Sequence, residues 1–432
     1  MSSYFIESFK IDKLWDYRDV DLTFSNDVNV LIGPNGSGKT TILNLLHAIL
    51  SGDLQSVVNF NFQQAKIGLK SFKGNSVRTI KIDTGEEFLK LKVGKKEYEA
   101  PIDIFSRRKP VRSPLRYFHE RDNVIRNMLS EEIDGESTPI VPLVWLPVSR
   151  RLPVTEDEEE RYTKREPLES VDLRLEELLE GLSRYHSILN AQLSERYRQF
   201  EHQVLSVILY SKEHDQLKSI RNSVFHSLPT EAEKDQLLNA FEAAGFLDES
   251  MQSRIDDHFA AFEAAKKVLP LIYAGKDIPL EFEDTFVIPL IGRTKAMVKY
   301  AGELEEDKER IFASLRFYEK TVNSFFNNKS IKVDGNGILN IKSPSPSELN
   351  WCFLSSGEKQ ILILLTQALL KVDKPVVYIA DEPELSLHVT WQEKLLESIV
   401  TLGGQKQIIV ATHSPDIVGK FQDKVIDLGG QS

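Results

Sequence analysis

The chain has 432 residues, 41% of them hydrophobic, and this length predicts two or three domains with a sizeable core. The 54 Lys and Arg residues against 65 Asp and Glu give a net charge of −11, which argues against a protein built as a bulk polyanion binder. One cysteine, no signal-peptide pattern in Met1–Glu7 and no run of about 18 apolar residues predict a cytoplasmic protein without disulfides or membrane contact.

The N-terminal segment alternates apolar and polar residues, a pattern typical of strands. Three strands are expected, at 4–6, 9–11 and 20–24. Trp15 and Tyr17 lie between the second and third strands and could stack on a purine base. Aromatic residues in such a meander are more often core or rim residues, so both interpretations stay open.

A glycine-rich loop at 33–40 fits the pattern G-x-x-x-x-G-K-[ST]. A buried strand is predicted before it and a helix after it, at 28–32 and 41–50. Glycines let backbone N–H groups close around phosphate oxygens, and the helix N-terminus adds partial positive charge. We expect Lys39 to reach the β- and γ-phosphates and the Thr40 hydroxyl to ligate Mg²⁺. The predicted nucleoside triphosphate site comprises Gly33, Pro34, Asn35, Gly36, Ser37, Gly38, Lys39, Thr40 and Thr41.

Residues 60–100 alternate again, which predicts an antiparallel sheet with one solvated face. Its strands are expected at 66–70, 77–82 and 88–93. A basic run with interleaved aromatic residues follows over Arg107–Arg126. This run is interpreted either as a contact for nucleic acid or an acidic partner, or as an ordinary solvated loop. An apolar strand at 141–147 is expected to return to the main sheet.

After an acidic stretch at 156–160 the pattern becomes helical. Apolar residues recur at three- and four-residue steps from about 173 to 210, which predicts a long amphipathic helix. Further helices are expected at 231–244, 251–268 and 293–326, and Thr230 is a good N-cap for the first of them. Residues 151–328 are therefore expected to form an all-helical, partly coiled-coil insertion between 1–150 and 329–432.

Two carboxylates end an apolar strand predicted at 375–382. This strand is expected to place Asp381 beside the Mg²⁺ held by Thr40. Glu382 would lie within reach of a water in line with the γ-phosphate. His413 ends another core strand, where it can donate a hydrogen bond to a γ-phosphate or hold the attacking water. Taken alone, such a histidine is more often structural, but this ordered set favours a catalytic role.

A hairpin is expected at 331–341, and a second anion site follows it. A serine hydroxyl and free backbone N–H groups precede a helix predicted at 361–370, and a helix N-terminus attracts negative charge. The residues of this site are Ser355, Ser356, Gly357 and Glu358.

Together these motifs resemble the ABC-type ATPases, in the branch that holds the SMC, Rad50 and RecF heads. Residues 33–40 resemble Walker A, 354–358 the signature motif, 378–382 Walker B, and His413 the switch histidine. The resemblance implies an α/β fold: a P-loop head of mixed sheet and antiparallel β subdomain, interrupted by the helical insertion. It further implies hydrolysis of ATP to ADP and phosphate with Mg²⁺. The signature of one subunit would cap ATP held by another, in a homodimer or a higher homo-oligomer.

Three segments narrow the resemblance to the OLD or AAA15 ATPases of prokaryotic anti-phage systems, namely 354–360, 381–388 and 411–415. Size and the helical insertion most resemble the ATPases of PARIS systems, with Septu-type ATPases as the alternative. The sequence departs from the group pattern in two places. Ser356 replaces the usual signature glycine, and Val389 replaces a common proline. No glutamine can be assigned to a Q-loop.

The resemblance implies an ATPase that senses a phage-encoded trigger protein and controls a separate effector nuclease of the Toprim or HNH type. A separate effector is expected because the chain ends soon after His413 and carries no nuclease motif elsewhere. The alternative is a RecF- or Rad50-like ATPase of DNA repair. The basic run favours that alternative, whereas the acidic total and the lack of a long coiled coil disfavour it. A transporter subunit is disfavoured by the long interval between Walker A and the signature.

Overall fold

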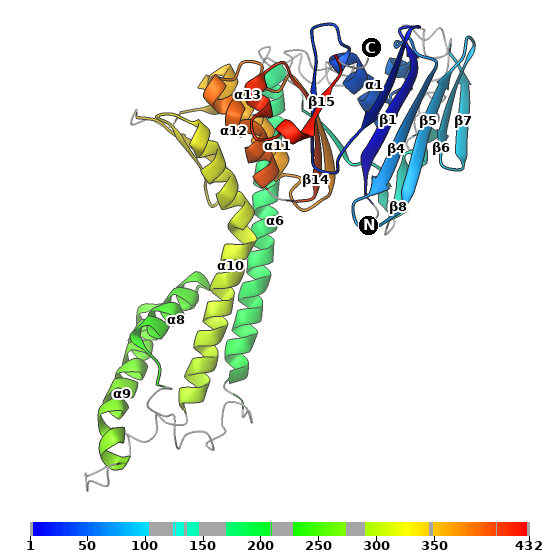
Figure 1. Ribbon diagram of the computed structural model, residues 1–432. Coiled ribbons are helices and arrows are strands. Elements are labelled where there is room, and N and C mark those ends of the chain that lie inside the picture. The colour runs from blue at the N-terminus through cyan, green and yellow to red at the C-terminus, as the bar shows by residue number, and fades with distance from the viewer. Residues whose placement is uncertain are drawn as a thin grey trace, which may run out of the picture. The chain divides into compact units, whose positions relative to one another are not determined.

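The computed structural model describes residues 3–102, 124–125, 127–133, 136–146, 170–207, 209, 228–273, 290–344, 349–402 and 404–429. They belong to two compact units (Figure 1). The first consists of Met1–Ser183 and Phe317–Ser432, and the second of Arg184–Arg316. No helix of the described residues is long and apolar enough to cross a membrane. The three-part division at 150 and 328 stays a prediction.

An antiparallel sheet of six strands belongs to the first unit, in the order β2-β1-β4-β5-β6-β7. Its strands are β1 (Tyr4–Leu14), β2 (Arg18–Thr23), β4 (Gln64–Ser71), β5 (Val77–Thr84), β6 (Phe88–Val93) and β7 (Lys96–Pro101). Burial alternates along them, as in β6, so the predicted sheet with one solvated face is confirmed. The prediction of separate strands at 4–6 and 9–11 is wrong. A bulge between Ile6 and Ser8 absorbs one residue and lets a single strand continue.

The second sheet of this unit is wholly parallel, in the order β10-β13-β14-β3-β15. Its strands are β3 (Val28–Ile32), β10 (Leu143–Leu146), β13 (Val376–Asp381), β14 (Lys406–Ala411) and β15 (Val425–Asp427). Strands β3, β13 and β14 are almost continuously apolar because both faces of the sheet are covered. The strand predicted at 141–147 is confirmed as β10, which pairs with β13.

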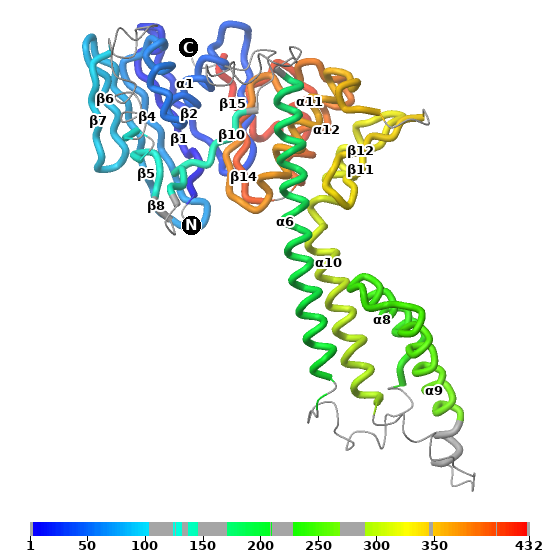
Figure 2. Tube along the Cα trace, turned by 180° about the vertical axis from the view of Figure 1, so that it is seen from behind, coloured from blue at the N-terminus to red at the C-terminus, as the bar shows by residue number. Residues whose placement is uncertain are grey.

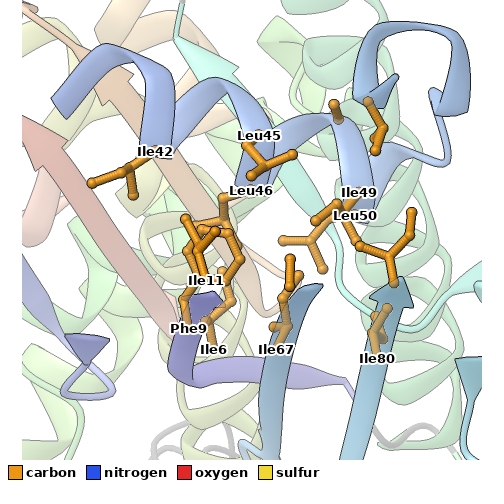
Figure 3. Close-up of a cluster of buried hydrophobic side chains, with 14 of the residues drawn as sticks. Ile6, Phe9, Ile11, Ile42, Leu45, Leu46, Ile49, Leu50, Ile67 and Ile80 are labelled. Atoms are coloured by element: carbon orange, nitrogen blue, oxygen red, sulfur yellow. The ribbon is translucent and has the colours of Figure 1, made fainter. Parts of the chain in front are cut away.

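Helix α1 (Lys39–Ser51) packs between the two sheets. Figure 3 shows its apolar side chains against the antiparallel sheet; the labelled residues are Ile42, Leu45, Leu46, Ile49 and Leu50 of α1, with Ile6, Phe9, Ile11, Ile67 and Ile80. Gln407 of β14, fully buried, also joins the sheets. Its Nε2 donates to the carbonyl of Ile6 over 2.6 Å, and its Oε1 accepts from the Ile6 N–H over 2.9 Å. The side-chain amide therefore continues the hydrogen bonding of β1 into the parallel sheet.

Helices α11 (Ser356–Leu369) and α12 (Val389–Thr401) cover the other face of the parallel sheet (Figures 1 and 2). Helix α11 begins before the predicted start at Ile361, because Ser355 and Glu358 form a capping box. The β11–β12 hairpin is confirmed. The short elements are α2 (Leu54–Val57), β8 (Ser130–Ile133), β9 (Glu136–Pro139), β11 (Ser330–Val333), β12 (Leu339–Lys342), η4 (Trp351–Phe353), α13 (Pro415–Val418) and η5 (Gln422–Lys424).

The second unit is helical, as predicted. The long helices are α6 (Ser170–Val207), α8 (Glu231–Ala243), α9 (Glu249–Tyr273) and α10 (Ile291–Phe325); α6 and α10 contribute residues to both units. A core of apolar side chains joins them, including Phe200, Leu237, Phe259 and Val298. The predicted N-cap is confirmed, since Thr230 forms a full capping box with Glu233.

Candidate nucleotide-binding site

Apart from the signature segment, the predicted site residues follow the carboxyl ends of three adjacent parallel strands, β3, β14 and β13. Their register is level, because Leu31 pairs with Ala411 and Ala411 pairs with Asp381. Backbone bonds continue this line past the strand ends: the N–H of Thr412 donates to Leu31 and that of Glu382 to Ala411. The crevice outside such strand ends is where ligands bind in parallel sheets. Residues far apart in sequence therefore meet at one edge.

The loop Gly33–Thr40 connects β3 to α1, and its backbone requires glycine. Gly36 and Gly38 have φ of 82° and 83°, in the left-handed region, and Gly38 is the N-cap of α1. A Cβ on Gly33 would lie 2.8 Å from the Ser37 Oγ. Pro34 and Asn35 are exposed at the tip, while Ser37 is buried. The open loop can therefore turn N–H groups toward an anion at the start of α1, in which Thr40 and Thr41 occupy the first turn.

Lys39 is buried within this loop, with 4% of its surface exposed. Its Nζ donates to the carbonyls of Gly33 over 2.8 Å and Pro34 over 3.3 Å. Burial lowers the pKa of the Lys39 ammonium, while the carboxylates of Glu382 and Asp381 act in the opposite direction. The ammonium of Lys39 is thus poorly hydrated and near the strand-end carboxylates. From this position it would be attracted to the oxygens of a bound phosphate.

The side chain of Thr40 lies close enough to the Asp381 carboxylate to act on its pKa. Burial raises the pKa of Asp381, as do the carboxylates of Glu382 and Glu384, against the opposing effects of Thr40 and Lys39. Its Oδ1 is buried without a hydrogen-bond partner. A hydroxyl beside a buried, unpartnered carboxylate oxygen fits the hard oxygen ligands that Mg²⁺ prefers.

Glu382 and His413 face each other at the open side of the strand ends. The Nε2 of His413 lies 3.6 Å from the Oε1 of Glu382, and each side chain is 39% exposed. Glu382 has φ of 52°, which a non-glycine residue rarely adopts. Both side chains can therefore reach solvent water, while the Glu382 N–H donates to the carbonyl of Ala411 and the His413 N–H to the side chain of Glu384.

The signature segment forms the N-terminus of α11. Ser355 is exposed and caps the helix, and the Glu358 carboxylate accepts from its N–H over 2.8 Å. Glu358 also pairs with Lys329 over 2.8 Å, so its charge is already engaged. A Cβ on Gly357 would lie 2.9 Å from the carbonyl of Ser386, so only glycine allows this approach. Ser356 is exposed at the first helical position. A direct contact of these residues with a nucleotide stays a prediction.

Two aromatic residues and one arginine lie beside the phosphate loop. The Trp15 ring comes within 2.7 Å of where a Cβ on Gly38 would stand, and it stacks on Tyr17 at 6.3 Å. Arg18 donates to the carbonyls of Ser37 over 2.7 Å and Leu428 over 2.8 Å. Arg18 was not predicted from sequence, because bonds to backbone carbonyls leave no local pattern. With Tyr17 74% exposed, stacking on a purine stays a prediction.

Glu384 is a second residue at the strand ends that was not predicted from sequence. Its Oε1 accepts hydrogen bonds from the Thr412 hydroxyl, from the N–H of His413 over 3.2 Å and from the N–H of Ser414 over 3.3 Å. The segment 381–388 that contains Glu384 was recognised in the sequence. The residues that donate to Glu384 follow a different strand, β14, so the sequence did not indicate this contact. The predicted basic run and the segment after β10 in which a Q-loop was sought lie outside the described residues, apart from Val124 and Ile125.

The parallel sheet, the phosphate loop and the strand-end carboxylates define a P-loop ATPase head of the ABC type, with an antiparallel β subdomain. Residues 5–418 match the model of AAA_15, the AAA ATPase domain. The chain belongs to this ATPase family.

The chain is also similar to two named ATPases and to one solved structure. The chain is 19% identical over 427 residues to the retron Vc95 probable ATPase of Vibrio cholerae serotype O1 biovar El Tor. The alignment covers 93% of this chain and 69% of that protein. It is 31% identical over 91 residues to the DNA double-strand break repair Rad50 ATPase of Methanopyrus kandleri, or 17% of this chain and 10% of that protein. The Smc head domain crystallised with ScpA from Pyrococcus furiosus aligns at 13% identity and TM-score 0.38, covering 98% of this chain and 93% of that one. The fold assignment rests on the strand order itself.

Proposed function

We propose that this chain binds ATP with Mg²⁺ and hydrolyses it to ADP and phosphate. The observation that carries the proposal is the meeting of a phosphate loop, the neighbouring side chains of Thr40 and Asp381, and a Glu382–His413 pair at the ends of adjacent strands. Each part matches one requirement of phosphoryl transfer, namely phosphate binding, metal ligation and positioning of water.

The residues would divide this work as follows. Loop amides and Lys39 bind the β- and γ-phosphates, and the desolvated ammonium supplies positive charge where charge develops. The Thr40 hydroxyl and Asp381 hold Mg²⁺, which would neutralise charge on the phosphates. Glu382 accepts a hydrogen bond from the attacking water and polarises it, and His413 orients that water or the γ-phosphate.

Two substitutions separate binding from hydrolysis. Lys39→Ala should weaken ATP binding by about 100-fold, because the loop loses its cation. Glu382→Gln should bind ATP with unchanged affinity but lower the turnover number by about 100-fold or more, because an amide is not a base. Fluorescent-nucleotide titration and phosphate release measure the two effects.

Glu393→Gln is the matched control for that charge change, because Glu393 is exposed on α12, away from the strand ends. It should leave both measurements unchanged. Turnover of Glu382→Gln close to that of the unmodified protein would overturn the assignment of Glu382.

We further propose that the ATPase acts as sensor and scaffold in an anti-phage defence system, where it controls a separate effector nuclease. Two observations support this: the likeness of segments 354–360, 381–388 and 411–415 to the OLD/AAA15 group, and the relative named as the probable ATPase of a retron. A PARIS- or Septu-type system is the specific form we favour, with a phage-encoded protein as the trigger. Nucleotide must then bind the holding and releasing states with different affinity.

Expression in bacteria tests this role. The chain alone should be harmless and give no protection from phage. Co-expression with its genomic neighbour should protect, and Lys39→Ala or Glu382→Gln in that pair should abolish protection, with Glu393→Gln as control. Protection by the chain alone, or degradation of nucleic acid by the purified protein, would contradict a separate effector.

The Rad50 match favours one alternative, a DNA-repair ATPase that binds DNA directly. Such a protein would bind duplex DNA with an affinity that falls steeply with salt, because phosphate contacts release counterions. Tight, salt-dependent DNA binding by the isolated chain together with a lack of phage protection would favour this alternative.

A further inference from the structure

Glu384 connects two of the strand ends that form the site. It lies in the turn between β13 and α12, and its Oε1 accepts hydrogen bonds from three successive residues after β14, Thr412, His413 and Ser414. The Thr412 hydroxyl, almost fully buried, also accepts from the Ser414 N–H over 2.9 Å. The segment 412–414 is therefore clamped by one carboxylate oxygen of the neighbouring strand end.

This clamp fixes the backbone that carries His413. The imidazole is exposed by 39% and faces Glu382 across 3.6 Å, a distance that a small backbone shift would change. Glu382 is itself held by its N–H bond to Ala411, the residue before Thr412. The separation of the two side chains thus depends on how Glu384 holds 412–414 relative to β13.

The clamp lowers the stability of the folded protein. The Oε2 of Glu384 is buried without a hydrogen-bond partner, and the carboxylate adds negative charge beside Asp381 and Glu382. A buried, half-satisfied carboxylate lowers stability, and groups of this kind concentrate at functional sites. A purely structural link through the Thr412 hydroxyl would not need three donors from three successive residues.

We propose that Glu384 is a positioning residue for ATP hydrolysis, which sets His413 against Glu382 by clamping residues 412–414 to the strand end of β13. The proposal rests on the ATPase function proposed above. Glu384 touches neither nucleotide nor water in this role. Its loss should leave ATP binding intact and slow the chemical step.

Turnover of five variants tests the clamp. Glu384→Ala should lower kcat by about 100-fold with the KM for ATP within about twofold, because a displacement near 1 Å at a reacting group costs that much. Glu384→Gln retains an acceptor oxygen and should restore kcat to within about fivefold of the original. Thr412→Val should lower kcat by about tenfold, whereas Thr412→Ser, which keeps the hydroxyl, should not. The double variant Glu384→Ala/Thr412→Val should be no slower than Glu384→Ala. Both substitutions remove the same hydrogen bond, between Glu384 and Thr412, so their effects should not add.

Hydrogen exchange of the amides of His413 and Ser414 measures the clamp itself, without activity. Both amides donate to Glu384, so exchange should quicken in Glu384→Ala and stay slow in Glu384→Gln. The effect should be larger at His413, because the Ser414 N–H also donates to the Thr412 hydroxyl. Unchanged exchange and unchanged kcat in Glu384→Ala would overturn the proposal, as would a Glu384→Gln variant as slow as Glu384→Ala. An unmodified protein that binds ATP without turnover, with exchange as expected, would instead refute the proposed hydrolysis and leave only the clamp.

Discussion

At the scale of residues, the site concentrates unfavourable features. The carboxylates of Asp381 and Glu382 act on one lysine, Lys39, and that of Glu384 acts on Asp381. One oxygen of Asp381 and one of Glu384 are buried without hydrogen-bond partners. Glu382 adds a left-handed backbone, which costs on the order of 1–3 kcal/mol in a non-glycine residue. Such features persist where bound ligands make use of them, because proteins accept lower stability at functional sites.

The charge of Asp381 makes the stability of the protein depend on pH. Because the folded state raises the pKa of Asp381, its contribution to stability is fully present below the unfolded value near 3.8 and is lost as pH rises through the folded value. At neutral pH the charge is therefore destabilising without a ligand. Asp381→Asn should raise the free energy of unfolding of the nucleotide-free protein by about 1 kcal/mol. The gain should disappear on acidification below the unfolded pKa, where both states are protonated.

Thermal unfolding across pH measures this gain, with Asp373→Asn, an exposed site, as control. Asp381→Asn should also lose the stabilisation that Mg²⁺ and a non-hydrolysable ATP analogue give to the original protein, because the metal loses a ligand. An Asp381→Asn protein that is less stable without ligand, or equally stabilised by Mg²⁺ and nucleotide, would contradict a metal-binding Asp381.

At the scale of elements, most of the fold was predictable because its signals are local. The continuous apolar runs of β3, β13 and β14 and the helical period of α6 are readable within a short window. The errors have physical causes. A bulge joined two predicted strands into β1, and the capping box at Ser355 extended α11 through a polar first turn that carries no apolar period.

The site was predictable to the same extent. Lys39, Thr40, Asp381 and Glu382 belong to motifs whose spacing is local, whereas parallel pairing of β3, β14 and β13 brings the motifs together. Arg18, Gln407 and Glu384 could not be predicted. Each acts on backbone groups of a distant segment, such as Leu428 for Arg18 and Ile6 for Gln407, and no periodicity records such a pairing.

At the scale of the whole molecule, the surface around the signature segment indicates a partner. Phe353, directly before the motif, is 76% exposed, and Leu385 in the turn after β13 and Val389 at the start of α12 are about half exposed. Gly357 lies against the carbonyl of Ser386, so the turn after β13 packs on the start of α11, and exposed large apolar side chains that gather on a surface are typical of interaction sites. The exposed Ser355 and the N-terminus of α11 follow Phe353 in the chain and offer N–H donors to an anion. We propose that a second copy of the chain, with ATP in its phosphate loop, covers this surface.

The pairing should therefore depend on ATP and on protein concentration. Glu382→Gln with Mg²⁺ and ATP should shift in light scattering from 49.3 kDa to twice that mass, because bound ATP is not consumed. Lys39→Ala should stay at 49.3 kDa with ATP. Phe353→Ser should weaken pairing by about tenfold or more, as loss of an aromatic anchor does, while Phe88→Ser on the antiparallel sheet should not. Specific activity of the original protein should rise with its concentration until pairing is complete. A protein that is monomeric with ATP and fully active at every concentration would show that one copy holds the whole site.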